Sequence, residues 1–538
     1  MTGSDPEKRL NTATGFQQIE KVTSGPEAFL SNEKRDDSET FSIGDVTLEA
    51  TITESDPEVY KKLGFSFPTL KKWYILSVIF VVQCSMNFNT SIYSNAIEGL
   101  QEEFSISAQA ARVGQLVFLV TYAFGCELWA PWSEELGRKP ILQLSLFLVN
   151  IWQIPCALAQ NFGTIVVCRF LGGLSSAGGS VTLGMVADMW EPEDQQFAVA
   201  FVVFSSVGSA VLGPIVGGFS ETFLHWRWVF WLQLMFGGFT QLLHLLTVVE
   251  TRSTVLMNKE ADRLRKTGKN YTHIKAERIF TIAGLPVKEI LTIWIRPFKM
   301  FCTEPIVLFL SLLSGFSDAL IFTFLESYSP VFKQWNFSKI AVGLAFIPLV
   351  VGYFIAWFSF MPWFIRQKQK MKSGDFQPEY RLYWLLYTAP LEAIGLFGFA
   401  WTSLGPSHGI PWIAPLLFSG LVGIANYAIY MATIDYMVSI YGPYAASATG
   451  GNGFARDFLA GIAALYATPL YSNVGPSNRH LPYASTILGC LAVLVTIPIY
   501  IFYFYGPEIR ARSKFALKIM SANEDRHAKH RAAAGSSA

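Results

Sequence analysis

The most constraining feature of this chain is a series of long apolar runs that cover most of its 538 residues. A helix that crosses a bilayer needs about 20 apolar residues, and about twelve runs meet that criterion. Such helices satisfy their own backbone hydrogen bonds, which lipid cannot do for them. The sequence therefore predicts an all-α membrane protein with about twelve transmembrane helices. The expected spans are residues 73–97, 113–132, 141–159, 164–189, 197–219, 226–249, 305–332, 340–364, 382–401, 410–440, 446–470 and 483–505.

Composition excludes several classes of function. Only 15% of the residues are charged and the formal net charge is +1, which argues against a nucleic-acid partner. The six cysteines lie in or beside apolar runs, without the spacing of a metal site or a disulfide framework. No phosphate-binding Gly-Lys-Ser/Thr loop and no Ser-His-Asp arrangement stands out. We therefore expect no enzyme, no ATP-driven pump, no metal and no cofactor.

The spacing of the runs predicts two six-helix bundles separated by a long connector rich in Lys and Arg. Within that connector, residues 254–269 place Leu, Met and Ala at helical spacing among charges, which is typical of an amphipathic helix on a membrane surface. The polar N-terminal segment lacks periodicity, and we expect a disordered cytoplasmic tail there. The predicted division is a tail at 1–70, bundles at 71–249 and 301–507, a connector at 250–300 and a tail at 508–538.

The distribution of basic residues predicts how the chain is oriented. Lys and Arg in short loops favour the cytoplasmic side. Arg138 and Lys139 follow the second run, and a second basic group, 366–381, lies between the eighth and ninth runs. All these loops share one side if both termini are cytoplasmic. The sequon at Asn336 then lies in an outside loop, where glycosylation is expected.

The fifth run contains an unusual density of glycine. In a soluble helix each Gly costs about 1 kcal/mol relative to Ala, and an interior Pro about 3 kcal/mol. In lipid, small residues instead allow helices to approach closely. Gly213 and Gly217 lie four residues apart on one face, and from the residues alone this indicates a tight packing interface. The motif consists of Gly208, Gly213, Pro214, Gly217 and Gly218.

With further motifs in the same order, this run resembles the antiporter motif of the major facilitator superfamily. Within that superfamily it resembles the fungal twelve-helix drug:proton antiporters, which include polyamine and multidrug exporters. The further motifs are the loop at 130–139, Arg169 with Gly173, Glu250-Thr251-Arg252, residues 378–382, and residues 445–448 followed by Arg456 and Pro469. The loop departs from the family pattern at Ala130 and Glu135. The resemblance covers roughly residues 70 to 520.

The resemblance assigns the loop after the second helix to a gate. Glu134, Arg138 and Asp188 are expected at the cytoplasmic ends of the second and fourth helices, where an ion pair can form in one state and break in another. The gating set is Glu134, Gly137, Arg138, Lys139 and Asp188.

Ionisable residues inside the runs are candidates for proton coupling, since a charge in a membrane is costly and usually faces a cavity or a partner. The resemblance implies that Arg169 faces the central cavity and takes part in coupling, whereas the alternative is that it binds carbonyls of a neighbouring helix. Glu326 and Asp318 lie eight residues apart and can share a helix face. Either carboxyl is a candidate proton carrier, and a structural role is the alternative.

Polar and aromatic residues in the first and tenth runs are candidates for a substrate cavity. Aromatic rings beside carboxylates hold an organic cation by cation–π contact. The alternative is that these side chains only pack. The candidates are Asn87, Asn89, Tyr93, Asn426, Tyr427, Asp435 and Tyr436, whereas Glu127 and Glu392 receive no role.

These features together predict a secondary active transporter that exports a small amphiphilic or cationic compound, driven by the proton gradient. The expected compounds are a drug, a polyamine or a secondary metabolite. We expect a monomer in the lipid bilayer of the plasma membrane, with a small-molecule substrate as its partner. The alternatives are an importer or facilitator of a metabolite such as an organic acid, in which Arg169 binds the anion, and a receptor that transports nothing.

Overall fold

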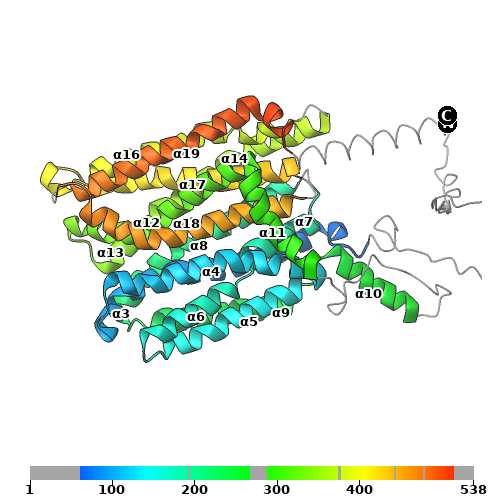
Figure 1. Cartoon of the computed structure of the whole chain (residues 1–538), viewed down its shortest axis with the longest axis horizontal. Helices are drawn as coiled ribbons and strands as arrows, with labels where there is room; N and C mark the ends of the chain where they lie inside the picture. Colours follow the sequence, from blue (N-terminus) through cyan, green and yellow to red (C-terminus); the bar gives the residue numbers. More distant parts are fainter. Residues whose placement is uncertain are drawn as a thin grey trace, which may run out of the picture. The chain divides into compact units, whose positions relative to one another are not determined.

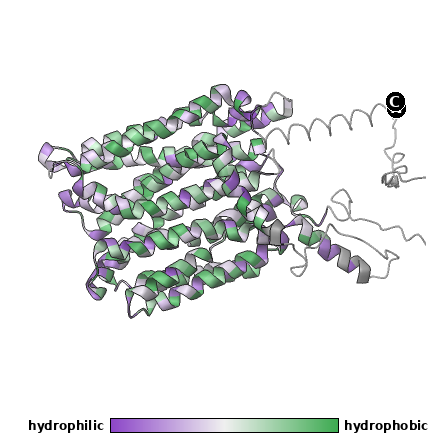
Figure 2. Cartoon of the chain, viewed as in Figure 1, coloured by the Kyte–Doolittle hydropathy of each residue, from purple (hydrophilic) through white to green (hydrophobic). Residues whose placement is uncertain are grey.

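The computed structural model describes residues 61–191, 194–266, 287–373, 377–441, 444–476 and 479–513. All regular secondary structure in these ranges is helical. Figure 1 shows the long helices lying alongside one another. Figure 2 shows apolar residues along their lengths, with hydrophilic residues at many helix ends and on α10 (Ser253–Lys266). Leu246, Leu417 and Phe504 are among the large apolar side chains left exposed, as expected for helices surrounded by lipid.

The first half of the chain folds into the helices expected for six spans. Its elements are η1 (Gly64–Ser66), α2 (Thr69–Ser91), η2 (Ile92–Ala96), α3 (Ile97–Phe104), α4 (Ala108–Glu135), α5 (Arg138–Ala157), α6 (Phe162–Leu174), α7 (Gly178–Met189), α8 (Gln195–Phe223) and α9 (Trp228–Thr247).

The second half begins after α10 and a further helix, α11 (Val287–Thr303). Its elements are α12 (Pro305–Phe332), η4 (Lys333–Trp335), α13 (Lys339–Leu344), α14 (Ile347–Ser373), η5 (Pro378–Leu382), α15 (Leu385–Thr388), α16 (Pro390–Thr402), η6 (Pro406–His408), α17 (Ile413–Tyr441), α18 (Ala445–Asn473) and α19 (His480–Arg510).

The number of spans differs from the prediction at one helix. Among the described residues, 11 segments are long and apolar enough to cross a membrane. They correspond to the predicted runs except the eleventh, where α18 is long enough but is not among them. The sequence of α18 contains Asn452, Arg456 and Asp457 among many Gly, Ala, Ser and Thr residues. Because α18 packs against α12 and α4, protein surrounds much of it, which explains why it needs less apolar surface.

The fourth span is broken in its middle, which the apolar pattern did not predict. The helix stops at Leu174 and resumes at Gly178. Side chains of neighbouring helices bind the freed backbone groups: Trp129 donates to the carbonyl of Leu174 over 3.0 Å, and Ser145 bonds both the Ser175 carbonyl and the Ala177 N–H. A break at membrane depth is stable only with such partners.

Contacts between the halves follow a repeated pattern. The second span, α4, packs against α18, and the fifth, α8, packs against α13, α14 and α17. The two halves therefore meet along two seams. The end of the molecule where α4 ends and α5 begins is called the Arg138 end below, and the opposite end, where α8 ends and α13 begins, is called the Lys339 end.

Several predictions lie wholly or partly outside the described residues. Residues 1–60, 267–286 and 514–538 contain most of the two predicted tails and part of the connector. Within the described parts of the connector, residues 253–266 form α10, and residues 287–300 belong to α11. The position of α10 on a membrane surface stays a prediction.

Candidate functional site

A cavity of about 680 Å³ lies between the halves, lined mainly by α4 and α7 from the first half and by α17 and α18 from the second. Leu183, Val199, Ile434 and Val438 give it apolar walls. It also contains an unusual number of charged side chains for a site between membrane helices. These are Glu127, Glu134, Arg138, Asp188, Arg252, Arg381, Asp435, Arg456 and Asp457.

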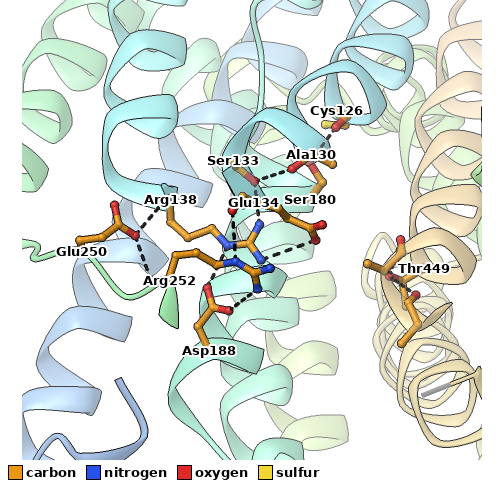
Figure 3. Close-up of polar contacts among 12 residues, drawn as sticks. Cys126, Ala130, Ser133, Glu134, Arg138, Ser180, Asp188, Glu250, Arg252 and Thr449 are labelled. Atoms are coloured by element: carbon orange, nitrogen blue, oxygen red, sulfur yellow. Dashed lines mark hydrogen bonds and ion pairs between the residues drawn. The ribbon is translucent and has the colours of Figure 1, made fainter. Parts of the chain in front are cut away.

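Four of the charged side chains from the first half, Glu134, Arg138, Asp188 and Arg252, form a cluster at the Arg138 end (Figure 3). Arg138 donates from Nε to Asp188 over 2.9 Å and from Nη1 to Ser133 over 2.6 Å. Arg252 donates to the second oxygen of Asp188 over 3.2 Å, and Glu134 lies 3.8 Å from Arg138. Both Arg138 and Asp188 are buried. The predicted gating residues Glu134, Arg138 and Asp188 therefore lie together on the cavity wall, and their role as a gate stays a prediction.

The start of α5 is fixed by a carboxylate from the end of the first half. Glu250 accepts backbone hydrogen bonds from Arg138 over 3.0 Å and from Lys139 over 3.1 Å. A helix N-terminus has unpaired N–H groups and a partial positive charge, so a carboxylate there is favourable. Gly137 adopts a φ of 105°, and a Cβ there would lie 2.5 Å from Glu250. This explains the glycine in the motif and places Lys139 outside the Asp188 cluster.

The second half has its own charged clusters at the same end. Arg381 pairs with Asp435, which also accepts a hydrogen bond from Gln196 of α8 over 3.0 Å. Glu379 accepts from Arg510 at 2.8 and 3.1 Å and from the Tyr436 hydroxyl at 3.4 Å. Asp435 thus lines the cavity but already has a basic partner. Tyr436 does not line it.

Arg169 lies away from this cavity, in the core of the first half. It is 1% exposed and donates to the Asn89 side chain over 2.9 Å and to the Gly114 carbonyl over 3.3 Å. Its guanidinium lies over the rings of Tyr93 and Phe118 at 4.6 and 4.0 Å. These contacts match the alternative in which Arg169 holds neighbouring helices together, and its predicted coupling role stays untested.

The two candidate proton carriers of α12 each have a basic partner. Glu326 accepts from Arg112 of α4 over 2.7 Å, and Asp318 lies 3.8 Å from Arg456 of α18. Neither carboxyl lines the cavity. The sequence did not point to Arg112, because its partner lies 214 positions away along the chain. The sequence around Arg112 shows only a basic residue near the start of an apolar run.

The remaining predicted substrate residues bond to protein groups. Tyr93 donates to the Ala111 carbonyl over 2.9 Å, and Tyr427 donates across the halves to the Ala200 carbonyl over 2.9 Å. Asn87 bonds Ser206, and Asn426 bonds Ser317. With Asn89 on Arg169, none of these five residues lines the cavity. Their assignment to a substrate site stays a prediction, and the structure gives them packing roles.

The glycine motif of α8 is a packed interface. A Cβ at Gly213 would lie 2.0 Å from Ser91 Oγ, and one at Gly217 would lie 2.1 Å from Asn95 Oδ1. Both contacts are with the end of the first span, α2 and η2. Gly218 faces the second half, because its Cβ would lie 2.9 Å from the Lys339 carbonyl. Gly208 differs, since a Cβ there would have no neighbour closer than 3.7 Å.

The Lys339 end is held by ion pairs between the halves. Lys339 of α13 lies 2.6 Å from Glu98 of α3 and 2.8 Å from Glu221 of α8. Nothing in the sequence predicts this cluster, because all three residues lie at the ends of apolar runs. Asn336 lies at the same end, exposed, with a φ of 58°. Its glycosylation stays a prediction.

Comparison with known proteins identifies relatives over most of the chain. The sequence model of the Major Facilitator Superfamily matches residues 79–465. The transporter paaT of Penicillium rubens is 33% identical over 476 residues, which cover 87% of this chain and 83% of that protein. The citrinin biosynthesis cluster transporter mrr1 of Monascus ruber is 29% identical over 88% of this chain and 93% of its own. The multidrug transporter FLR2 of Candida glabrata is 29% identical over 96% and 87%, respectively.

A solved structure supports the same fold. The proton:xylose symporter XylE superposes with a TM-score of 0.56 and 17% sequence identity, covering 81% of this chain and 97% of XylE. At that identity the likeness concerns the fold alone.

Proposed function

This chain is a transporter of the Major Facilitator Superfamily, and from that membership we propose that it exports a small amphiphilic or cationic compound in exchange for protons. The observation that carries the proposal is the cavity between the halves, about 680 Å³ with apolar walls and charged side chains. An apolar cavity with a few charged groups suits a small amphiphile. The names of two relatives, a multidrug transporter and a citrinin-cluster transporter, favour drugs or secondary metabolites over polyamines.

The two ends of the molecule support an exchange mechanism. The Lys339 end is held by ion pairs between halves, whereas the cavity is lined at the Arg138 end by pairs within each half. In transporters built from two repeats, one half rocks against the other around a central site. We propose that the Arg138 end faces the cytoplasm, with both termini there and the protein in the plasma membrane as a monomer. Lys and Arg in the loops at this end favour that orientation.

The test uses inside-out plasma-membrane vesicles with an acidic interior and ethidium, a fluorescent amphiphilic cation, as the probe. We expect ethidium to accumulate and the accumulation to disappear when nigericin collapses the pH gradient. Vesicles from the same host without the protein are the matched control. Uptake that nigericin does not affect indicates a facilitator.

Organic acids, the alternative substrate class, are tested with a different probe. Benzoate replaces ethidium in the same vesicles and in right-side-out vesicles. Transport of benzoate alone, in the inward direction, would favour the importer alternative. Absence of any transport across a wider panel of amphiphiles, with correctly folded protein present, would favour the receptor.

A further inference from the structure

One acidic side chain in the cavity differs from all the others in its surroundings. Glu127 of α4 is 6% exposed and lines the cavity wall. Among the described residues it makes no hydrogen bond and no ion pair with any protein group. It is therefore a buried carboxyl that faces the cavity without a partner.

The other acids of the cavity wall each have a basic neighbour. Asp188 pairs with Arg138 and Arg252, and Glu134 lies 3.8 Å from Arg138. Asp435 pairs with Arg381. Asp457 lies 3.5 Å from Arg456. Among the lining acids in the described ranges, only the charge of Glu127 is left uncompensated.

The position of Glu127 links it to the relative movement of the halves. Its two carboxyl oxygens lie against α18 of the second half, where a Cβ at Gly450 would come within 2.6 and 2.7 Å of them. The glycine thus leaves the space that the carboxyl occupies. Since α4 and α18 form one of the two seams between the halves, any rocking changes what surrounds this carboxyl.

An isolated carboxylate between membrane helices is costly unless a proton or a cation joins it. We propose that Glu127 is the proton-exchange residue of this transporter, an inference that rests on the proposed proton-coupled function. With the cavity open, its carboxylate takes a proton from hydronium, forming one O–H bond and releasing one water. The reverse step returns the proton to water after the halves have moved.

Glu326 and Asp318 do not fit this role as well. Glu326 has Arg112 at 2.7 Å and lies outside the cavity wall, and Asp318 faces Arg456. A carboxylate with a fixed cation has no need of a proton. The other charged or titratable groups of the cavity wall are Cys126, Glu134, Arg138, Asp188, Arg252, Arg381, Tyr430, Asp435, Arg456 and Asp457. Arg296 lies on α11, which also packs against α4.

The first test needs no substrate and no variant. Dicyclohexylcarbodiimide reacts with protonated carboxyls in apolar surroundings, whose O–H adds across one C=N bond. The full-length protein in lipid nanodiscs is treated across a pH series, and peptides are mapped by mass spectrometry. We expect an adduct on Glu127 that declines as pH rises, and none on Glu326. An adduct on Glu326 without one on Glu127 would overturn the proposal.

The second test separates this inference from the proposed function. In the ethidium vesicles, we expect Glu127→Gln to lose gradient-driven accumulation while keeping exchange of labelled for unlabelled ethidium at equal pH. Glu127→Asp should retain part of the coupling. Glu102→Gln, an exposed acid of α3, is the matched control and should behave as wild type.

If wild type couples ethidium to protons and Glu127→Gln couples equally well, the inference fails and the proposed function stands. If wild type shows no coupling to any probe, the proposed function fails. In that case, pH-dependent labelling of Glu127 still decides whether the carboxyl takes up a proton.

Discussion

The two ends of the molecule stabilise the same pair of halves in different ways. At the Lys339 end, ion pairs join the halves, and Gly218 and Gly343 allow α8 and α13 to touch. At the Arg138 end, the strongest charged contacts stay within one half, as between Arg138 and Asp188. Two exceptions lie at the start of α8, where Gln196 bonds Asp435 and Asp194 pairs with Lys368.

This difference shows how the two halves can be open to one side at the Arg138 end while they are closed together at the Lys339 end. Pairs between halves must break for an end to open, whereas pairs within a half can persist through the motion. The ion pairs of Lys339 are partly exposed and therefore weak, as is required of contacts that break and form again when this end opens and closes. In the Arg138 cluster, the central pair of Arg138 and Asp188 is buried, which suits contacts that hold the helices of the first half together.

The largest expected effect comes from breaking the buried cluster at the Arg138 end. Arg138→Ala leaves Asp188 with Arg252 alone, and removal of one partner of a buried pair costs about 3–5 kcal/mol. We expect a lower thermal unfolding midpoint and lost ethidium transport. Arg138→Lys should recover only part of both, because Lys lacks the planar fork that reaches Asp188 and Ser133 together.

The control for that change is Arg479→Ala, at an exposed position at the other end of the second half. It should leave the unfolding midpoint and transport unchanged. If Arg138→Ala unfolds at the wild-type midpoint, the cluster does not stabilise the first half. The proposed difference between a stabilising Arg138 end and a reversible Lys339 end would then be wrong.

A smaller effect is expected from overpacking the glycine face near the Lys339 end. Gly217→Leu places atoms where Asn95 lies, and overpacking typically costs about 1–3 kcal/mol. We expect membrane insertion with lost transport, measured by surface expression and by ethidium accumulation. Gly208→Ala adds to the same helix a Cβ that meets nothing closer than 3.7 Å, so this variant should transport normally. Normal transport by Gly217→Leu would show that this face is not packed during the cycle.

Much of the fold follows from the apolar pattern, because span length and hydropathy are local properties. The predicted runs overlap the observed helices, although some helices extend well beyond them, as α14 does to Ser373. The glycine face of α8 packs closely at Gly213 and Gly217. The break between α6 and α7 was missed because Trp129 and Ser145, far from it in sequence, make it stable. The apolar run alone does not indicate which side chains of other helices will contact it.

The site was less predictable, since charge pairing depends on which helices meet. The sequence indicates Glu326 because it is an ionisable residue inside an apolar run and can share a helix face with Asp318, but Arg112 from another helix pairs with it. It gave no role to Glu127, whose significance comes from lacking the partner that the other cavity acids have. Asp435 was assigned to substrate, although Arg381 pairs with it.

A still smaller effect should follow from weakening the ion pairs of Lys339. Lys339→Gln removes two partly exposed pairs worth about 0.2–1 kcal/mol each, so the ratio of open to closed molecules should change by roughly five-fold. Spin labels at Glu102 and Ser407, in a background without the exposed Cys302 and Cys490, report the distance across this end. We expect a larger population of long distances. An unchanged distribution would mean that helix packing, and not Lys339, holds the end closed.

The smallest effect concerns which end faces outward. Asn336 lies at the Lys339 end, so a glycan there would place that end outside the cell. Asn336→Asp removes the sequon while keeping a residue that tolerates the left-handed φ of 58°. Ser338→Thr keeps both the sequon and the hydroxyl that caps α13 through the Ala341 N–H. We expect a deglycosidase to shift wild type and Ser338→Thr on a gel, and to leave Asn336→Asp unshifted, with transport normal in all three. A wild-type band that does not shift would contradict the predicted glycan and leave the orientation to protease protection of tags at Met1 and Ala538.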